Sequence, residues 1–305
     1  MKKIVFFMES DFMYHCGGIV VQYELAKNLN NSMVDVKIIS PRNIKNNIYN
    51  DFLLTKTLDD ADIDNTIVIY GETIRGNPLN AKYVIRWILA PIGICSHIDN
   101  YKTWGPNDLV YYFNSEDKFI KEPEKVGKEY KLLNIIFINP NAINLNLQNR
   151  SGTCHTFRKS NYHKNIQLIH PSNSFEVTWS HTQEDNIKIF NQYKYFISYD
   201  PLTFLSIIAA LCGCISIVKN VDGLSKDAWL NKLPVSEYFK ESGENTLYGM
   251  AYGVDDLENA INTLHLVKKQ WDDIKNFMIN KNIKSFLDDM DNFDTLVNNV
   301  QNNFY

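Results

Sequence analysis

The chain has 305 residues, 45% of them hydrophobic, and a formal net charge of −4 at pH 7. Because domains usually span roughly 100–200 residues, this length predicts two domains, and the apolar fraction excludes an intrinsically disordered chain. The slightly negative charge gives no general attraction to nucleic acid or to an anionic membrane, so any anion-binding site must be local.

The first residues and the cysteines indicate a cytoplasmic protein. An apolar run begins at Ile4 and ends at Glu9 without a small-residue cleavage site, which favours a core strand over a signal peptide. No apolar run approaches the roughly 18 residues of a membrane span, so we expect at most peripheral membrane contact. The five cysteines are scattered and lack metal-ligand spacing, which predicts reduced thiols and no metal site.

Short apolar runs alternate with helical patterns along the first half of the chain, as is typical of an α/β fold. Apolar residues at helical spacing predict a helix over 19–30. Strands are predicted at 3–8, 34–39, 66–70, 83–89, 109–113 and 133–138. The polar, aperiodic stretch 139–151 predicts a linker, which divides the chain into domains 1–145 and 146–305.

A second α/β series follows this linker. Strands are predicted near 152–157, 166–169, 194–199, 214–218 and 247–251, and helices over 183–191, 202–212 and 255–268. The tail 269–303 is helical in pattern, with Trp271, Ile274, Phe277 and Met278 on one stripe. We expect these C-terminal helices to pack back on the first domain.

Residues 193–218 form the most informative stretch. An apolar strand leads into the turn Asp200-Pro201-Leu202-Thr203, and then into a helix, a glycine stop and a second strand. Pro201 suits the first helical turn, which would place Asp200 at the N-cap. The N–H groups of Leu202, Thr203 and Phe204 would then be free to bind a phosphate. The alternative is a capped helix that binds nothing.

Two further pairs of residues are candidates for ligand binding. Gly17-Gly18 lies between the first strand and the first helix, where glycine lets the backbone approach a ligand, although the pair does not form a GxGxxG fingerprint. Arg158-Lys159 follows the first strand of the second domain and could bind a diphosphate. The alternatives are an ordinary turn for the glycines and a solvated basic edge for the cations.

Glu72, His15 and His97 are candidate general bases, because each lies on a loop of the first domain. A solvated loop side chain is the alternative for each of them. The sequence contains no HExxH, GxSxG or GxxxxGK[ST] motif, which argues against a metallohydrolase, an α/β-hydrolase and a P-loop NTPase.

Several segments together resemble the GT-B-fold glycosyltransferases. Gly17-Gly18 with 24–29 resembles the "GG…LA..L" start of the family-4-like members, and 198–214 resembles their donor-site signature. Three segments are similar to a subgroup found in polysaccharide-assembly loci: Gly76-Asn77-Pro78-Leu79 with Val84-Ile85-Arg86-Trp87, Tyr199 to Thr203, and Tyr248-Gly249-Met250-Ala251-Tyr252-Gly253.

This resemblance implies two Rossmann-like domains that face each other across a cleft. It implies metal-independent transfer of a sugar from a nucleotide-diphosphate sugar, without another cofactor, to a glycan or lipid-linked acceptor. From the net charge we expect no nucleic-acid partner, and a homodimer is one option for the assembly. Arg158, Lys159 and the helix start at 202–204 would bind the diphosphate, and Asp200 would be the first acid of the signature. If the reaction inverts the anomeric configuration, Glu72 or His15 would take the acceptor proton.

The second acidic position of the signature is Ile208, which is not an acid. Two alternatives therefore stay open. One is a GT-B-like sugar-nucleotide epimerase, which would also need a basic diphosphate site. The other is a non-catalytic nucleotide- or sugar-binding module, which the missing acid favours.

Overall fold

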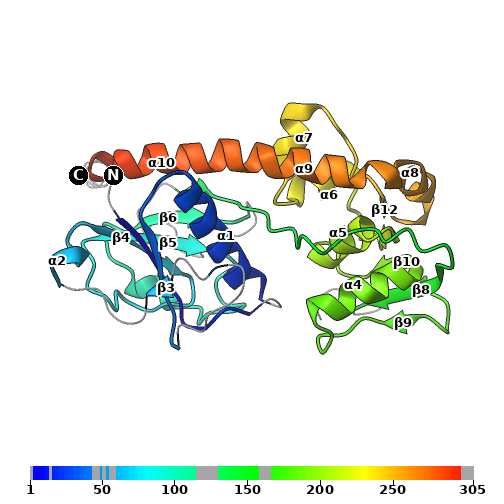
Figure 1. The fold of residues 1–305 in the computed structure, drawn as a ribbon, viewed down its shortest axis with the longest axis horizontal. Helices are drawn as coiled ribbons and strands as arrows, with labels where there is room; N and C mark the ends of the chain where they lie inside the picture. The colour runs from blue at the N-terminus through cyan, green and yellow to red at the C-terminus, as the bar shows by residue number, and fades with distance from the viewer. Residues whose placement is uncertain are drawn as a thin grey trace. The chain divides into compact units, whose positions relative to one another are not determined.

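The computed structural model describes residues 3–13, 16–42, 49, 53–54, 60–114, 130–157 and 166–296 (Figure 1). Internal contacts divide the chain into unit 1, Met1–Phe137 with Phe277–Tyr305, and unit 2, Ile138–Asn276. The linker was expected within 139–151, with a boundary between residues 145 and 146. The contacts instead place the change of unit between Phe137 and Ile138 and assign the end of the chain to unit 1.

Unit 1 contains a seven-stranded sheet in the order β3-β2-β1-β4-β5-β6-β7, with every pair parallel. Its strands are β1 (Lys3–Phe7), β2 (Val36–Ile39), β3 (Leu53–Leu54), β4 (Thr66–Gly71), β5 (Tyr83–Ile88), β6 (Leu109–Tyr112) and β7 (Tyr130–Leu132). The order runs one way from β1 to β3 and the other way from β4 to β7. This is the strand order of a doubly wound Rossmann-like fold, and its reversal lies between β1 and β4.

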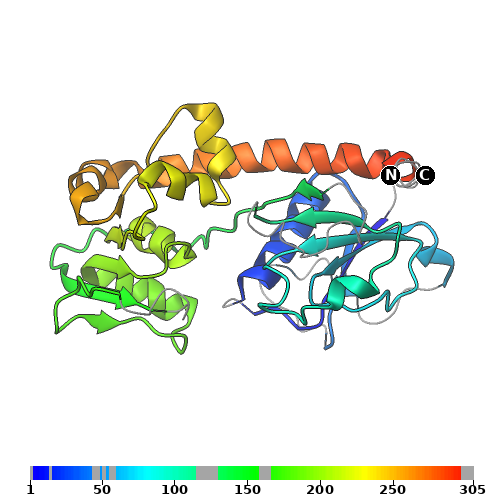
Figure 2. The same cartoon turned by 180° about the vertical axis from the view of Figure 1, so that it is seen from behind.

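The two faces of this sheet are covered by different structures, because successive side chains of a strand point to opposite faces. One face carries Ile4, Ile67 and Ile85 and is covered by α1 (Gly17–Asn31) and α10 (Lys284–Asp291), which Figures 1 and 2 show on the same side of the sheet. The other face is covered by α2 (Asp60–Ile63), η2 (Asn100–Thr103) and loops.

Unit 2 contains a five-stranded parallel sheet in the order β12-β11-β10-β8-β9. Its strands are β8 (Ser151–Thr156), β9 (Phe175–Glu176), β10 (Tyr193–Ser198), β11 (Ile215–Val218) and β12 (Met250–Tyr252). Counted within the unit, this order is 2-1-3-4-5, the flavodoxin-like order, with its reversal between β8 and β10. The prediction of an α/β chain with two Rossmann-like sheets is confirmed.

The helices of unit 2 lie between and beside these strands. They are α4 (Gln183–Gln192), α5 (Phe204–Leu211), α6 (Lys226–Lys232), α7 (Ser236–Ser242), η5 (Val254–Asp256), α8 (Leu257–Thr263), η6 (Leu264–Leu266) and most of α9 (Val267–Met278). Phe190 of α4 packs edge-on against Phe196, whereas Ala260 of α8 packs with Ile197. Helices therefore cover both faces of the sheet.

Two predicted strands are wrong, at 133–138 and 166–169. The first is buried, but side chains take its carbonyl groups: the Trp87 indole donates to the Leu133 oxygen at 2.9 Å, and Asn282 Nδ2 donates to the Asn134 oxygen at 2.8 Å. In the second, the N–H of Ile169 donates to the Tyr199 hydroxyl at 2.8 Å. Burial explains the apolar character of 133–138, where the N–H of Leu133 still donates to the Tyr112 carbonyl at 2.9 Å. Burial does not explain 166–169, because Leu168 is 58% exposed.

The C-terminal segment packs on the unit 1 sheet. After α9 the chain forms a π-helical turn, η7 (Ile279–Ile283), and then α10. Phe286 contacts the Tyr111 ring edge-on at 5.4 Å between centroids. Asp289 accepts from Tyr111 Oη and Lys131 Nζ, both at 2.6 Å. Among the described residues, no helix is both long and apolar enough to cross a bilayer.

Candidate functional site

An open pocket of about 900 Å³ lies in unit 1 where the strand order reverses. Connections leave β1 and β4 in opposite directions, which opens a crevice beyond the carboxyl ends of these strands. The pocket is lined by residues that follow β1, β2 and β4, among them Glu9, Ser40 and Arg75, and by His97 and Asn100 of the next loop. A fold of this class is expected to bind a ligand at this position.

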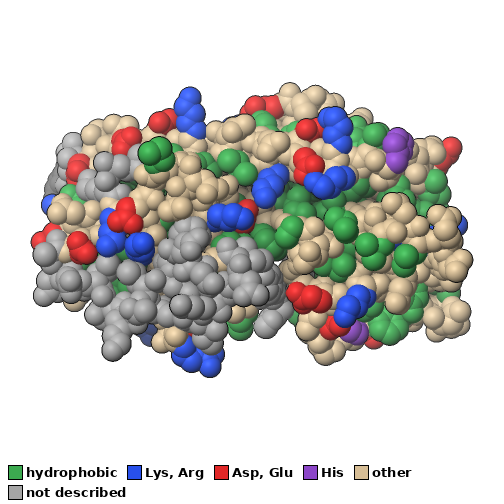
Figure 3. Space-filling view, in the orientation of Figure 1, with side chains coloured by type: hydrophobic (Ala, Val, Ile, Leu, Met, Phe, Trp, Pro, Cys, Tyr) green, Lys and Arg blue, Asp and Glu red, His purple; other side chains and the backbone are tan. Residues whose placement is uncertain are grey.

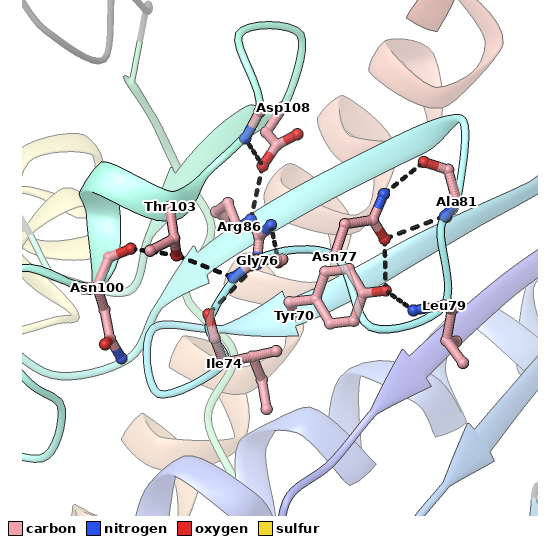
Figure 4. Close-up of polar contacts among 11 residues, drawn as sticks. Tyr70, Ile74, Gly76, Asn77, Leu79, Ala81, Arg86, Asn100, Thr103 and Asp108 are labelled. Atoms are coloured by element: carbon pink, nitrogen blue, oxygen red, sulfur yellow. Dashed lines mark hydrogen bonds and ion pairs between the residues drawn. The ribbon is translucent and has the colours of Figure 1, made fainter.

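The loop that follows β4 is fixed by a buried arginine (Figure 4). The Arg86 side chain is fully buried, and its Nε pairs with Asp108 Oδ2 at 2.7 Å. Its two terminal nitrogens donate to the carbonyls of Ile74, at 3.4 Å, and Gly76, at 2.5 Å. The guanidinium also lies 4.7 Å from the centroid of the Tyr70 ring, in cation–π contact. Arg86 therefore anchors one wall of the pocket.

Asn77 completes this loop. Its Oδ1 accepts from the Tyr70 hydroxyl at 2.8 Å and from the Ala81 N–H at 3.0 Å, and its Nδ2 donates to the Ala81 carbonyl (Figure 4). The Tyr70 hydroxyl in turn accepts the N–H of Leu79 at 3.1 Å, and burial raises the pKa of Tyr70 to about 12. The Gly-Asn-Pro-Leu and Val-Ile-Arg-Trp segments thus form one hydrogen-bonded structure that shapes the pocket.

Glu72 follows β4 but lies behind the pocket wall rather than on it. It is 4% exposed, and its Oε2 accepts the N–H of Leu89 at 3.0 Å. Burial raises the pKa of this carboxyl group, and the charge of Glu9 adds to the effect. Asn100 Nδ2 donates to the main-chain oxygens of Glu72 and Thr73. The position after β4 was predicted from the sequence, but the inward orientation of the carboxylate was not.

Gly17 and Gly18 form the first two residues of α1, with Cys16 at the N-cap, so the helix starts two residues before its predicted span. A Cβ atom at Gly18 would lie 3.6 Å from the Leu89 side chain, and one at Gly17 would meet nothing within 4 Å. Gly18 and Glu72 therefore approach the same residue, Leu89. His15, the other predicted base, lies outside the described residues.

In unit 2 three loops begin side by side at the carboxyl edge of the sheet. The register pairs Thr156 with Ser198 and Ser198 with Val218, so Phe157, Tyr199 and Lys219 begin adjacent loops. The N–H of Lys219 donates to the Ser198 carbonyl at 2.8 Å, which continues the alignment. Lys219 is a cation at this edge, and its Nζ donates to Asn220 Oδ1 at 3.0 Å. Arg158 and Lys159 lie outside the described residues.

The start of α5 differs from its prediction. The N-cap is Thr203 rather than Asp200, and the helix begins at Phe204, so Pro201 and Leu202 precede it. Thr203 Oγ1 accepts the N–H of Leu205, and the Thr203 carbonyl accepts that of Ser206, each at 3.4 Å. Among the described residues, the N–H groups of Thr203 and Phe204 have no hydrogen-bond partner. Thr203 and Phe204 thus keep two of the three N–H groups that were expected to be free, although the helix itself begins later than predicted.

Tertiary contacts explain this shift. Trp229 Nε1 donates to the Pro201 carbonyl at 2.7 Å. In a helix that began at Pro201, the same carbonyl would accept a main-chain N–H of the helix itself. Asp200 is fully buried, and its N–H donates to Ser198 Oγ at 3.1 Å. Asp200 therefore closes a tight turn after β10 and does not cap the helix. Ile208 is buried within α5.

Strand β12 and its flanking glycines fix the loop that follows β11. The Tyr252 ring stacks on Trp229 at 4.8 Å between centroids, and its hydroxyl donates to the Leu224 carbonyl at 3.0 Å. Gly249 and Gly253 both have positive φ, at 68° and 83°, where larger residues are strained. The Tyr-Gly-Met-Ala-Tyr-Gly segment therefore orders the β11 loop, which includes Lys219.

Four rings meet at the reversal between β8 and β10, a cluster that the sequence did not predict. His155 stacks on His170 at 3.8 Å, and Phe157 stacks on Tyr199 at 4.1 Å. The Tyr199 hydroxyl lies 2.7 Å from His170 Nδ1. Burial, followed by the proximity of His170, lowers the pKa of His155. These residues come from separate elements, so no local pattern indicates that they meet.

On the face shown in Figure 3, acidic and basic side chains of the described residues are interspersed rather than segregated. Among the residues that the structure describes, no group of three or more His, Cys, Asp or Glu side chains has a metal-binding arrangement.

No protein-family model and no curated protein sequence matches the chain. Among solved structures, it is similar to an alpha-glucosyltransferase in complex with UDP and a 13-mer DNA containing an HMU base. The identity is 10%, the TM-score is 0.43, and the match covers 91% of this chain and 90% of that chain. It is also similar to an alpha-glucosyltransferase in complex with UDP and a 13-mer DNA containing a central A:G mismatch. Here the identity is 9%, the TM-score is 0.41, and the match covers 91% of this chain and 90% of that chain. At this level, neither similarity establishes a shared reaction.

Proposed function

We propose that the chain is a metal-independent glycosyltransferase that moves a sugar from a nucleotide-diphosphate sugar to a glycan or lipid-linked acceptor. One observation carries this proposal: each of its two α/β units has a strand-order reversal of the kind that binds ligands. Two such crevices in one chain suit a reaction with two substrates. The resemblance of the sequence to GT-B enzymes identifies group transfer as that reaction.

The donor is assigned to unit 2. The unpartnered N–H groups of Thr203 and Phe204 at the start of α5 are donors for a phosphate oxygen, and the helix dipole adds a favourable field. Lys219 lies at the same edge of the sheet, and Arg158 and Lys159 follow β8 in the sequence. Such donors and cations would stabilise the diphosphate as its bond to the sugar breaks.

The acceptor is assigned to the unit 1 pocket. His97 and Glu9 line it and can take a proton, whereas Glu72 lies behind the wall with its carboxylate bonded to Leu89. A proton from the acceptor hydroxyl would reach Glu72 through a bridging water or after movement of the wall. The raised pKa of Glu72 brings its proton affinity closer to that of a base working near neutral pH.

The first test is nucleotide binding by the intact chain. UDP, GDP and dTDP are screened by thermal shift, and at least one is expected to raise the melting temperature. Arg158→Ala should weaken that nucleotide by about 1.5–3 kcal/mol, the value of a charge-assisted hydrogen bond. Lys188→Ala, which removes an exposed cation of α4, serves as the control and should leave affinity unchanged. Failure of every nucleotide to stabilise the protein would contradict the proposal.

The second test is turnover with the matching nucleotide sugar. Neutral, acidic and lipid-linked glycans and duplex DNA are offered as acceptors, and the products are resolved by mass spectrometry and NMR. Sugar transfer supports the proposal, whereas isomerised donor would indicate an epimerase. Binding without turnover would indicate a non-catalytic binding module, which the buried Ile208 at the second acidic position favours.

A further inference from the structure

The unit 1 pocket has an uneven distribution of charge. Its lining includes one arginine, Arg75, on the loop after β4, one acidic residue, Glu9, on the loop after β1, and one histidine, His97. The remaining wall consists of hydroxyl, amide and apolar side chains. A ligand that carries one negative charge among neutral hydroxyl groups would match this distribution if its charge lies at Arg75.

Arg75 is exposed at this pocket and available for binding. No hydrogen bond or ion pair to its guanidinium occurs within the part of the chain that the structure describes. Asp99, an acidic group of the neighbouring loop, forms its ion pair with Lys102 at 2.7 Å. The hydrogen bond from Lys102 is the main cause that lowers the pKa of Asp99, and the charge of Arg75 contributes at longer range. An exposed arginine usually gains little from such surface pairs, so an unpaired guanidinium is not by itself a site.

The backbone around Arg75 makes the difference. On the N-terminal side of Arg75, the carbonyl of Ile74 accepts a hydrogen bond from Arg86 (Figure 4). On the C-terminal side, the N–H of Gly76 donates to Thr103 Oγ1 at 2.8 Å, and the Gly76 carbonyl accepts a second hydrogen bond from Arg86. Both neighbours of Arg75 are therefore fixed by buried groups, and Gly76 adopts a positive φ of 59°. Such preorganisation lowers the entropic cost of binding through the side chain between them.

A second polar group of the pocket also lacks a partner. Asn100 is 3% exposed, and its Nδ2 donates to two carbonyls, which fixes the orientation of the amide. Its Oδ1 has no hydrogen-bond partner among the described residues. A buried acceptor without a donor is costly, and a hydroxyl or water at the pocket floor would satisfy it after a small shift.

We propose that the unit 1 pocket selects a ligand with an anionic group, a carboxylate or a phosphate, and that Arg75 binds this group. The inference rests on the proposed function only in identifying the ligand as the acceptor, which would then be an acidic glycan or a sugar phosphate. Arg75 is a specificity-determining residue in this account. Arg86 positions it by fixing the loop on both sides.

The test uses matched probes on the full-length protein. Glucuronate and glucose differ by one carboxylate, and glucose 1-phosphate supplies the phosphate alternative; binding of each is measured by ligand-observed NMR titration. We expect both anions to bind the wild-type protein about tenfold more tightly than glucose, a difference of about 1.4 kcal/mol. Tighter binding of glucuronate would identify the anionic group of the ligand as a carboxylate, and tighter binding of glucose 1-phosphate would identify it as a phosphate. Equal affinity for glucose and both anions, or no binding by any probe at millimolar concentration, would overturn the proposal.

Variants assign the effect to Arg75. Arg75→Gln should remove the preference for anions and leave glucose binding unchanged, because the side chain is exposed and its loss does not disturb the core. Lys82→Gln, which removes another exposed cation of unit 1, should retain the preference. An unchanged preference in Arg75→Gln would refute the role of this residue. Nucleotide stabilisation, measured separately on the same variants, reports on the proposed donor site and distinguishes failure of one proposal from failure of the other.

Discussion

Replacing Arg86 by alanine tests whether burial gives this arginine its structural role. Arg86→Ala leaves the Asp108 carboxylate, 8% exposed, without its cation, and it removes the donors to the carbonyls of Ile74 and Gly76. Removal of one partner from a buried ion pair costs about 3–5 kcal/mol. We expect a loss of about 4 kcal/mol, which lowers the melting temperature of unit 1 by about 8–16 °C at 2–4 °C per kcal/mol.

Arg42→Ala provides a matched control within the same unit. Arg42 Nε and Asp11 Oδ2 are also 2.7 Å apart, but the Arg42 side chain is 75% exposed. Asp11 is buried, but after the substitution it still accepts from Ser40 Oγ and from the main-chain N–H of residue 42. A pair with an exposed arginine contributes about 0.2–1 kcal/mol, so this substitution should cost little. The assay is differential scanning calorimetry, with hydrogen exchange of peptides from β4 to β6 to assign the transition to unit 1. Costs within 1 kcal/mol of each other would refute the reasoning, since the two pairs have the same Nε–Oδ2 distance and their arginines differ in burial. If Arg86→Ala does not fold, Arg86→Lys serves in its place. Lysine keeps the positive charge but lacks the several donors of the guanidinium group, so it should lose less stability than the alanine variant.

Two further substitutions test the site and the fold. Burial raises the pKa of Glu72, so ionisation of this carboxyl group destabilises the folded state. The penalty is absent well below pH 4.5 and grows as the pH rises through the folded pKa. Glu72→Gln removes the penalty, so its melting temperature should exceed that of the wild type near pH 7 and match it in acid. If Glu72 is the base, the same variant should lose transfer activity by about 10²–10⁴-fold, and undiminished activity would exclude that role. In unit 2, a Cβ at Gly249 would lie 2.4 Å from Val267, whereas one at Gly223 would meet nothing within 4 Å. Gly249→Ala should therefore cost about 1–3 kcal/mol more than Gly223→Ala in urea unfolding, and equal costs would contradict the packing argument.

The strands buried on both faces were predictable from the sequence, and the two-residue edge strands were not. The runs that became β4 and β5 are apolar except for residues such as Thr66 and Arg86, because every position of both strands is buried. Strands β3 and β9 have two residues each, too few for a periodic pattern. The reversal of strand order beside β1 depends on pairing between distant segments, so the pocket position could not be derived from local patterns.

The start of α5 shows where local rules fall short in the candidate site. Asp200 and Thr203 are both acceptable N-cap residues, and Pro201 suits a first turn, so the sequence favoured the earlier start. The Trp229 indole, 28 positions further along the chain, donates a hydrogen bond to the Pro201 carbonyl, and the helix therefore has its N-cap at Thr203. Arg86 was quoted as part of a motif, but its partner Asp108 follows 22 positions later, and nothing local indicates the pair.

The assignment of residues 277–305 to unit 1 makes unit 2 a continuous insertion within it. During synthesis, every strand of unit 1 leaves the ribosome before unit 2 is made, yet Phe286, Met290 and Phe293, which complete the unit 1 core, emerge after it. Unit 2 can therefore finish folding while one face of its neighbour still waits for its last helix. Nascent unit 1 would expose apolar surface for the time needed to translate 138–276, and it is the part of the chain with the greater need for a chaperone.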